Sequence, residues 1–330
     1  MAIAVYGAGA VGLVVGARLA RAGNDVLFIT RRRKVAELIE GDGVRCEDLL
    51  AGEAWAIGVK AVAEVRAAAE RIEGGPVLFC MRRSETAPAA AALARAAPRA
   101  VVASLQNDVD NEEILARHFA TVIGGVYRQT CTRTAPNSAV TAGTGRVVLG
   151  THPRGAGPAA TSLAAAFRAA GYDVGLSRRI ARDLWLKLCI NLMSAPNALI
   201  RREDHDTRAF VELKARLLEE AKEALAAAGI EAASCDRRDR SLDEEIAFQR
   251  AALGRGTSAR RLPLYNQVWA SLEDGLPLEA DGYHRRVLDL AARHSLSLPK
   301  NERALAALER AACDALGPES ATAAEILGDP

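Results

Sequence analysis

The stretch that decides the fold is Ile3-Ala4-Val5-Tyr6 followed by the turn Gly7-Ala8-Gly9-Ala10-Val11-Gly12. The first four residues form an apolar run that predicts a buried strand. Residues 13–22 predict a helix that stops at Gly23, and residues 25–30 predict a second apolar strand. A strand, turn, helix and strand within about 30 residues form a βαβ unit, in which a right-handed crossover makes the two strands parallel.

The turn places glycine at its first, third and sixth positions, which is the GxGxxG spacing of dinucleotide-binding proteins. Gly7 permits the tight turn, Gly9 lets the backbone approach a pyrophosphate, and Gly12 lets the helix pack close to the strand. The helix N-terminus then offers N–H groups and the positive end of its dipole to phosphates. A glycine-rich turn without a ligand is the alternative. The expected cofactor contacts are Gly7, Ala8, Gly9, Ala10, Val11 and Gly12.

The end of the second strand indicates which dinucleotide is bound. An acidic residue there would bind the ribose 2′-hydroxyl of NAD, but this chain has Thr30 followed by Arg31, Arg32, Arg33 and Lys34. Cations at this place predict NADP(H), with Arg31 as the main ligand because a guanidinium contacts phosphate through two hydrogen bonds. Arg32 either stacks on the adenine or faces water. A solvated basic face at the start of a helix is the alternative interpretation.

The following 150 or so residues continue the alternation of strands and helices, and from about residue 181 helical patterns replace strands. Val44 to Val62 suggests an inserted β-hairpin, and 121–150 suggests strands, antiparallel, that close the sheet. We therefore expect an α/β fold with an N-terminal Rossmann domain at 1–178 and an all-α C-terminal domain at 179–330. Residues after 316 are expected to form a loose tail. Helices are predicted in the second domain at 212–228, 242–252, 265–273, 282–294 and 301–315.

Composition excludes several classes of protein. The net charge of +2 among 330 residues gives no support for nucleic-acid binding or for an anionic membrane partner. No uninterrupted apolar stretch reaches the roughly 18 residues of a membrane-spanning helix. None of the six cysteines lies in a CxxC pair or at metal-binding distance from a histidine, which favours free thiols, no metal and a reducing compartment. We expect a cytoplasmic protein.

The segment from Asp183 to Met193 is apolar at almost every position, which predicts a helix buried on most sides. Its polar residues Asp183, Lys187 and Asn191 are spaced by four and therefore share one face. A buried lysine is rare unless it is paired or lines a cavity. Lys187 is interpreted as pointing into a cleft between the domains; an ion pair with Asp183 is the alternative.

Five stretches together resemble the ketopantoate reductase family, the 2-dehydropantoate 2-reductases. They occur in the family's order, as GAGAVG at 7–12, TR at 30–31, SLQND at 104–108, LWLKLCIN at 184–191 and LEADGY at 278–283. The resemblance implies a Rossmann domain, a helical second domain, and NADPH-dependent reduction of a 2-keto acid to a 2-hydroxy acid. For that family the reaction is ketopantoate to pantoate, in pantothenate biosynthesis.

The resemblance also implies roles for individual residues. Lys187 corresponds to the family's catalytic lysine, the general acid, and Glu279 to its acidic active-site residue. Asn107 corresponds to an asparagine near nicotinamide and substrate, and Asn191 to one that holds the substrate. Ser271 is the candidate hydroxyl for the substrate carboxylate. The expected partner is a small keto acid, and a homodimer is left open as the assembly.

The substrate side departs from the family pattern at three places. Arg82-Arg83 stands where the family has a lysine, and Ala195 where it has a further asparagine. The family's serine position is Ala270, so Ser271 is displaced by a rotation of about 100° on a helix. These departures leave open a different keto or hydroxy acid as the substrate, or a non-catalytic NADP(H)-binding sensor.

Overall fold

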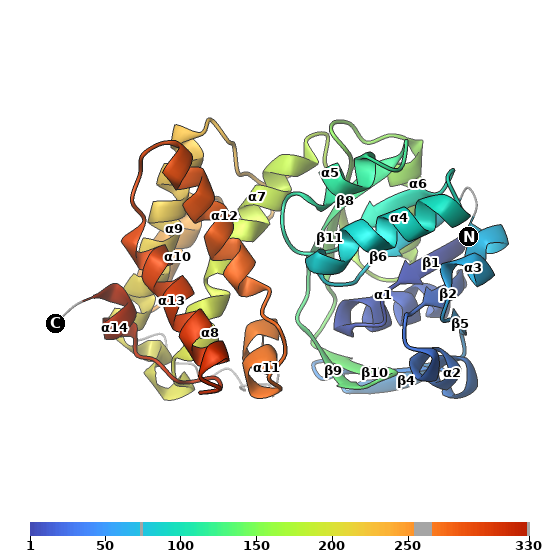
Figure 1. Ribbon diagram of the computed structural model, residues 1–330, viewed down its shortest axis with the longest axis horizontal. Helices are drawn as coiled ribbons and strands as arrows, with labels where there is room; N and C mark the ends of the chain where they lie inside the picture. The colour runs from blue at the N-terminus through green and yellow to red at the C-terminus, as the bar shows by residue number, and fades with distance from the viewer. Residues whose placement is uncertain (73–74, 254–265, 329–330) are drawn as a thin grey trace. The chain divides into compact units, whose positions relative to one another are not determined.

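A computed structural model describes residues 1–72, 75–253 and 266–328 (Figure 1). The chain divides into two compact units, Met1–Asp183 and Leu184–Pro330. The division falls inside one helix, α7 (Ile180–Leu192), just beyond the boundary expected at residue 178. Each unit is described below by itself.

The first unit is built on an eight-stranded sheet with the order β12-β11-β8-β7-β6-β1-β2-β5. The six strands from β5 to β8 in this order are parallel, and their arrangement is that of a Rossmann fold. Residues 121–150 were predicted to form antiparallel strands that close the sheet. This is correct for β11, which is antiparallel to β8, but wrong for β8, which is parallel to β7. The strands are β1 (Ala2–Tyr6), β2 (Asp25–Ile29), β5 (Lys60–Val62), β6 (Pro76–Phe79), β7 (Val101–Ser104), β8 (Val122–Arg128), β11 (Arg146–Thr151) and β12 (Asp173–Leu176).

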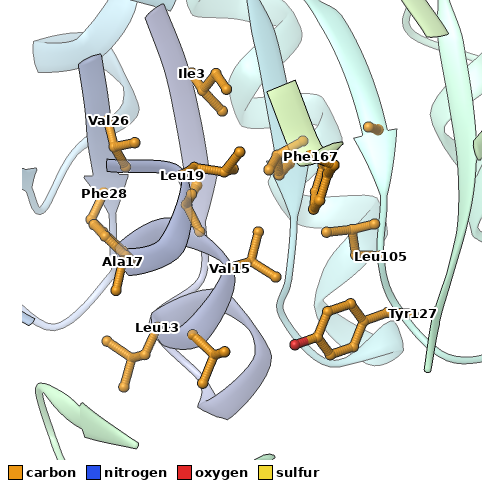
Figure 2. Close-up of a cluster of buried hydrophobic side chains, with 14 of the residues drawn as sticks. Ile3, Leu13, Val15, Ala17, Leu19, Val26, Phe28, Leu105, Tyr127 and Phe167 are labelled. Atoms are coloured by element: carbon orange, nitrogen blue, oxygen red, sulfur yellow. The ribbon is translucent and has the colours of Figure 1, made fainter. Parts of the chain in front are cut away.

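Side chains alternate between the two faces of this sheet, and each face is covered by helices. Val5 belongs to the apolar cluster under α1, α2 and α6, whereas Tyr6 belongs to the cluster under α3, α4 and α5. Figure 2 shows the first cluster, with Leu13, Val15 and Leu19 of α1 near Val26 and Phe28 of β2. The helices are α1 (Ala10–Arg21), α2 (Arg33–Asp42), α3 (Val65–Ile72), α4 (Thr86–Ala96), α5 (Asn111–Ala116) and α6 (Pro158–Ala169).

A second sheet of four strands, ordered β4-β3-β10-β9, packs against α1. It contains the expected hairpin, β3 (Val44–Asp48) with β4 (Glu53–Ile57), joined by β9 (Cys131–Ala135) and β10 (Ser138–Thr141). Arg18 of α1 secures the contact, because its Nη2 lies 3.1 Å from Asp48 Oδ2 and donates to the Gly143 carbonyl at 3.1 Å. Its guanidinium also lies 5.4 Å from the Tyr172 ring centre. The pairing of residues 44–48 with 138–141 was not foreseen.

The described part of the second unit contains helices only. They are α8 (Ser194–Leu199), η2 (Arg202–Asp206), α9 (Arg208–Ala227), α10 (Leu242–Arg250), α11 (Gln267–Glu273), α12 (Ala280–Arg293), α13 (Pro299–Cys313) and α14 (Ala323–Leu327), besides the greater part of α7. The five helices predicted here are confirmed; the first residues of the one predicted over 265–273 lie partly outside the described residues. No described helix is long and apolar enough to cross a membrane.

The expectation of a loose tail after residue 316 is wrong. Residues 323–327 form α14, which begins with a capping box between Thr322 and Glu325. The Leu327 carbonyl at its end accepts hydrogen bonds from Lys300 Nζ and Arg303 Nη1, both at 2.7 Å. The segment near residue 317, which contains glycine, proline and serine, therefore forms only a turn. After this turn α14 packs on α9 and α13.

Candidate active site

The functional candidates of the first unit follow the carboxyl ends of neighbouring parallel strands. The glycine turn follows β1, Arg31 follows β2, Arg82 follows β6 shortly after its end, and Asn107 follows β7. Because β2, β1, β6 and β7 are adjacent and parallel, these four segments lie along one edge of the sheet. This edge is where ligands bind in open α/β folds.

Close approaches require glycine at two positions of the turn and at one position of α1. Gly7 has φ +113°, and a Cβ there would lie 2.8 Å from the Met81 nitrogen. A Cβ on Gly12 would lie only 2.0 Å from the Gly7 carbonyl oxygen, so Gly12 is required by the turn itself. The glycine that lets α1 approach β2 is Gly16, where a Cβ would lie 2.3 Å from Phe28 Cζ. Gly16 was not singled out from the sequence.

Gly9 differs, because a Cβ on it would meet protein only at 3.6 Å, an ordinary contact. It is the N-cap of α1, its backbone is extended, and no side chain caps the helix. The first turn of α1 contains no acidic residue. The first N–H groups of a helix have no acceptor within it, so those of α1 face a place that suits a diphosphate. The residues present therefore fit the pyrophosphate of a dinucleotide.

Arg31 and Arg32 are both exposed where β2 ends and α2 begins. Arg31 Nη2 forms an ion pair with the Glu85 carboxylate, which comes from the short helix η1 (Arg83–Glu85) after β6. Tyr6, at the end of β1, lies close to both charges. Burial raises the pKa of its phenol, with Arg31 lowering and Glu85 raising it. The proximity of Glu85 to Arg31 has no signal in the sequence, since 54 positions separate the two residues.

Asn107 lies in the bend after β7, and its position is held by buried polar side chains. Asn111 Nδ2 donates to the Asn107 carbonyl at 2.8 Å, and Asn111 Oδ1 accepts from Thr86 Oγ1 at 2.9 Å. Gln106 Nε2 donates to Thr86 Oγ1 at 2.8 Å and to the Met81 carbonyl at 3.0 Å. The N-cap of α5 is Asp110, so Asn107 is not a helix cap. The network ties its backbone to the loop after β6.

The next residue, Asp108, has φ +91°, a left-handed conformation that is unfavourable for a side chain other than glycine. Its Oδ1 accepts from the Val109 N–H at 2.7 Å, and its Oδ2 lies 3.3 Å from Arg83 Nε. Arg83 also binds Asp110, with Nε at 3.0 Å from Oδ1, and this hydrogen bond raises the pKa of Arg83. Of the two arginines that stand in place of the family's lysine, Arg83 is thus committed to neighbouring carboxylates.

Glu112, in the first turn of α5, is only 1 % exposed. Burial raises the pKa of its carboxyl to about 8, and Asp110 and Asp108 add to the shift. Its oxygens make no hydrogen bond of normal geometry to the described residues, although its own N–H and the Ser104 hydroxyl lie close enough to oppose the shift. At neutral pH this carboxyl is therefore largely protonated. The sequence contains no sign of it beyond the pair Glu112-Glu113.

The lysine-bearing helix α7 has the predicted apolar surface. Lys187 and Asn191 are half-buried, whereas Leu186 and Cys189 are fully buried. Asp183 is buried and accepts a hydrogen bond from Ser177 Oγ at 2.7 Å, which fixes the start of the helix to the preceding loop. Lys187 and Asn191 are separated by four positions and so lie on one face of α7.

Two contacts bring other helices of the second unit to the end of α7. Asn266, the N-cap of α11, donates through Nδ2 to the Ser194 carbonyl at 3.0 Å. His284, in α12, is fully buried, and this burial lowers the pKa of its imidazole to about 4. The nearby Asn301 side chain and Leu192 carbonyl act in the opposite direction and raise the pKa. The start of α11 and the second turn of α12 therefore lie near residues 192–194, which follow Asn191 in the chain.

The remaining candidates belong to these two helices. Glu279 is the half-buried N-cap residue of α12, and its carbonyl accepts from the Gly282 N–H at 3.0 Å. Ser271 on α11 is buried, at 4 % exposed, whereas Ala270 is half-buried. Ala195, on α8, is fully buried. Among the described residues no cluster of histidine, cysteine, aspartate and glutamate could hold a metal ion.

The sequence profile described as ketopantoate reductase PanE/ApbA matches residues 3–154, and the profile of its C-terminal domain matches residues 179–312. Together they span most of the chain in the family's order. The chain belongs to the ketopantoate reductase family. Its members are NADP-dependent oxidoreductases that act on a CH–OH group. The present chain is an enzyme of that class.

Individual relatives agree with this assignment over nearly the full length. The 2-dehydropantoate 2-reductase of Halobacterium salinarum is 29 % identical over 307 residues, covering 91 % of this chain and 95 % of that protein. The crystal structure of a PanE/ApbA family ketopantoate reductase from Ralstonia eutropha JMP134 is similar with a TM-score of 0.76 and 26 % identity, covering 96 % of this chain and all of the other. A ternary structure of D-mandelate dehydrogenase with NADH and anilino(oxo)acetate has a TM-score of 0.80 at 17 % identity over 96 % of this chain and 100 % of that one, which shows the fold alone.

Proposed function

We propose that this enzyme reduces a 2-keto acid to a 2-hydroxy acid with NADPH, and that Lys187 is the general acid. The observation that carries the proposal is the half-buried Lys187 on a largely apolar helix, within the segment that matches the family's C-terminal domain. Ketopantoate, the substrate named for the relatives, is the first candidate, with pantoate as the product in pantothenate biosynthesis.

The proposed chemistry follows from charge development during reduction. The cofactor supplies a hydride to the carbonyl carbon, which leaves negative charge on the oxygen. The Lys187 ammonium would stabilise this charge and donate the proton that completes the hydroxyl. Glu279 would favour the charged form of the lysine. Asn107 and Asn191 would orient the substrate through hydrogen bonds.

A keto acid other than ketopantoate is the second candidate, and the substrate-side residues favour it. Ala195 stands where the family has an asparagine, is fully buried, and carries no polar atom in its side chain. Ala270 likewise lacks the hydroxyl of the family's serine, and the neighbouring Ser271 is buried. A site that lacks two polar groups would lose hydrogen bonds to a hydroxylated substrate, at about 0.5–1.5 kcal/mol each.

The test is a steady-state assay of NADPH oxidation with ketopantoate and a panel of 2-keto acids that differ in side-chain size and hydroxylation. Turnover of any of them supports the reductase, and the order of kcat/KM identifies the substrate class. Tight NADPH binding without turnover of any keto or hydroxy acid would instead identify a nucleotide sensor. The assembly state, for which a homodimer was left open, can be measured by sedimentation, and the cytoplasmic location stays a prediction.

Replacement of Arg31 by alanine is expected to weaken NADPH binding at least tenfold and NADH binding less than twofold, since a hydrogen bond between charged groups contributes about 1.5–3 kcal/mol. Dissociation constants from nucleotide fluorescence titration measure both. Arg21→Ala is the matched control, because it removes an exposed arginine at the C-terminal end of α1, away from the glycine turn at the start of that helix. An equal loss for both nucleotides would contradict the assignment of Arg31 to the 2′-phosphate.

A further inference from the structure

The carboxylate that is missing after β2 in the sequence is supplied in space by Glu85 of the short helix η1, which follows β6. The end of β2 continues into Thr30-Arg31 and carries no acidic residue, which predicts a site open to a 2′-phosphate. In the folded unit, however, Glu85 from the loop after β6 forms an ion pair with Arg31. The cation expected to bind the phosphate therefore already has an anionic partner.

Three adjacent strand ends produce this arrangement. β2 and β6 flank β1 in the sheet, so the residues after them lie on either side of the end of β1. Arg31 reaches across from one side and Glu85 from the other, near the buried Tyr6 of β1, whose phenol responds to both charges. Arg31 keeps 66 % of its side chain exposed and Glu85 keeps 32 %, so both groups are accessible to a ligand.

We propose that Glu85 is a specificity-determining residue that lowers the preference of this enzyme for NADPH over NADH. The proposal rests on the proposed role of Arg31 as the ligand of the 2′-phosphate. Glu85 acts in two ways: its carboxylate competes with the phosphate for the Arg31 guanidinium, and its negative charge repels the phosphate. Neither effect applies to NADH, which carries a neutral 2′-hydroxyl at this place.

The size of the effect follows from Coulomb's law. A carboxylate and a phosphate dianion separated by about 6 Å in water interact by an energy that corresponds to roughly tenfold in a binding constant. Both groups are at the surface, so salt should screen the effect within a Debye length of about 10 Å at 0.1 M. Removing the charge of Glu85 should therefore strengthen the binding of 2′-phosphorylated ligands, and the gain should shrink as ionic strength rises.

The experiment measures binding of nucleotide fragments to the full-length protein by isothermal titration calorimetry. Adenosine 2′,5′-bisphosphate and adenosine 5′-monophosphate differ only in the 2′-phosphate, and neither requires turnover. Glu85→Gln is expected to tighten the bisphosphate about tenfold in 50 mM salt, with less gain in 500 mM, and to change the monophosphate less than twofold. Glu37→Gln, an exposed glutamate on α2, is the matched control and should change neither ligand.

The outcomes separate this inference from the assignment on which it rests. An unchanged ratio of the two affinities in Glu85→Gln, together with selective loss of the bisphosphate in Arg31→Ala, would overturn the role of Glu85 and leave Arg31 in place. No selective loss in Arg31→Ala would overturn both. In the Arg31→Ala background the direct repulsion between Glu85 and the 2′-phosphate remains, so Glu85→Gln should still tighten the bisphosphate. Any reduction of the gain relative to the starting protein measures the competition for Arg31. Thermal melting of each variant shows that the fold is retained.

Discussion

Replacement of Lys187 by alanine is expected to lower kcat by about a thousandfold, because general acid catalysis contributes roughly 10²–10⁴ and one oxyanion-stabilising group roughly 10²–10³. Lys187 is the half-buried lysine of the largely apolar helix α7, and alanine would remove both the proposed proton donor and its positive charge. NADPH binding should change less than about threefold, since the residues assigned to the dinucleotide belong to the first unit.

The measurement is kcat with the best keto acid of the panel, alongside a fluorescence titration of NADPH. Lys222→Ala is the matched control, because Lys222 is an exposed lysine on α9 that pairs with Asp243. It should keep kcat within about twofold of the starting protein. If Lys187→Ala retains more than a tenth of the original kcat, Lys187 does not supply the proton. Lys187→Arg should also have a low kcat, since a guanidinium is a poor proton donor near neutral pH.

Replacement of Glu112 by glutamine is expected to stabilise the first unit at pH 8 by roughly 2–4 kcal/mol. The folded-state pKa of Glu112 is raised to about 8 from 4.5. Between these two values the unfolded chain has released the proton while the folded chain retains it, so stability falls as pH rises through this window. Glutamine is neutral at every pH and has nearly the same shape, so it removes this pH-dependent cost.

The free energy of unfolding from urea titration, measured at pH 4.5, 6 and 8, tests this expectation. The difference between Glu112→Gln and the starting protein should be within about 1 kcal/mol at pH 4.5 and should grow toward pH 8. Glu113→Gln is the matched control, because Glu113 is the adjacent but exposed carboxylate of the same helix turn. A gain that is equal at the three pH values would show that Glu112 is ionised in the folded protein.

The fold could be predicted largely from local patterns. The βαβ start, the change to helices near residue 180 and most helices follow from apolar periodicity and from glycine and proline positions. What could not be predicted depends on pairings between distant segments. The sequence of 131–141 is compatible with strands of either sheet, and the parallel pairing of residues 138–141 with β3 places these strands in the sheet that packs against α1. Local patterns likewise gave no sign that α14 is held by Lys300 and Arg303.

The candidate site shows the same division. The glycine turn, Arg31 and the lysine helix are recognisable because each lies in one short segment with a characteristic spacing. Glu85 and Arg83 are not, since their importance comes from partners on other strand ends. The burial of the Glu112 carboxyl could not be predicted from the sequence either, because glutamate is rarely fully buried. Contacts between charged residues that are far apart in the sequence can be identified only in the folded structure.

The close contact between Gly16 and Phe28 sets the spacing between α1 and the sheet beneath it. The aromatic ring occupies the volume that any side chain at position 16 would need. The two positions are therefore expected to vary together among relatives: a methyl group at 16 requires a shorter residue at 28, and an aromatic at 28 requires a bare backbone at 16. A side chain placed at position 16 while Phe28 is kept would push the helix outward, and with it the phosphate-binding turn at its start.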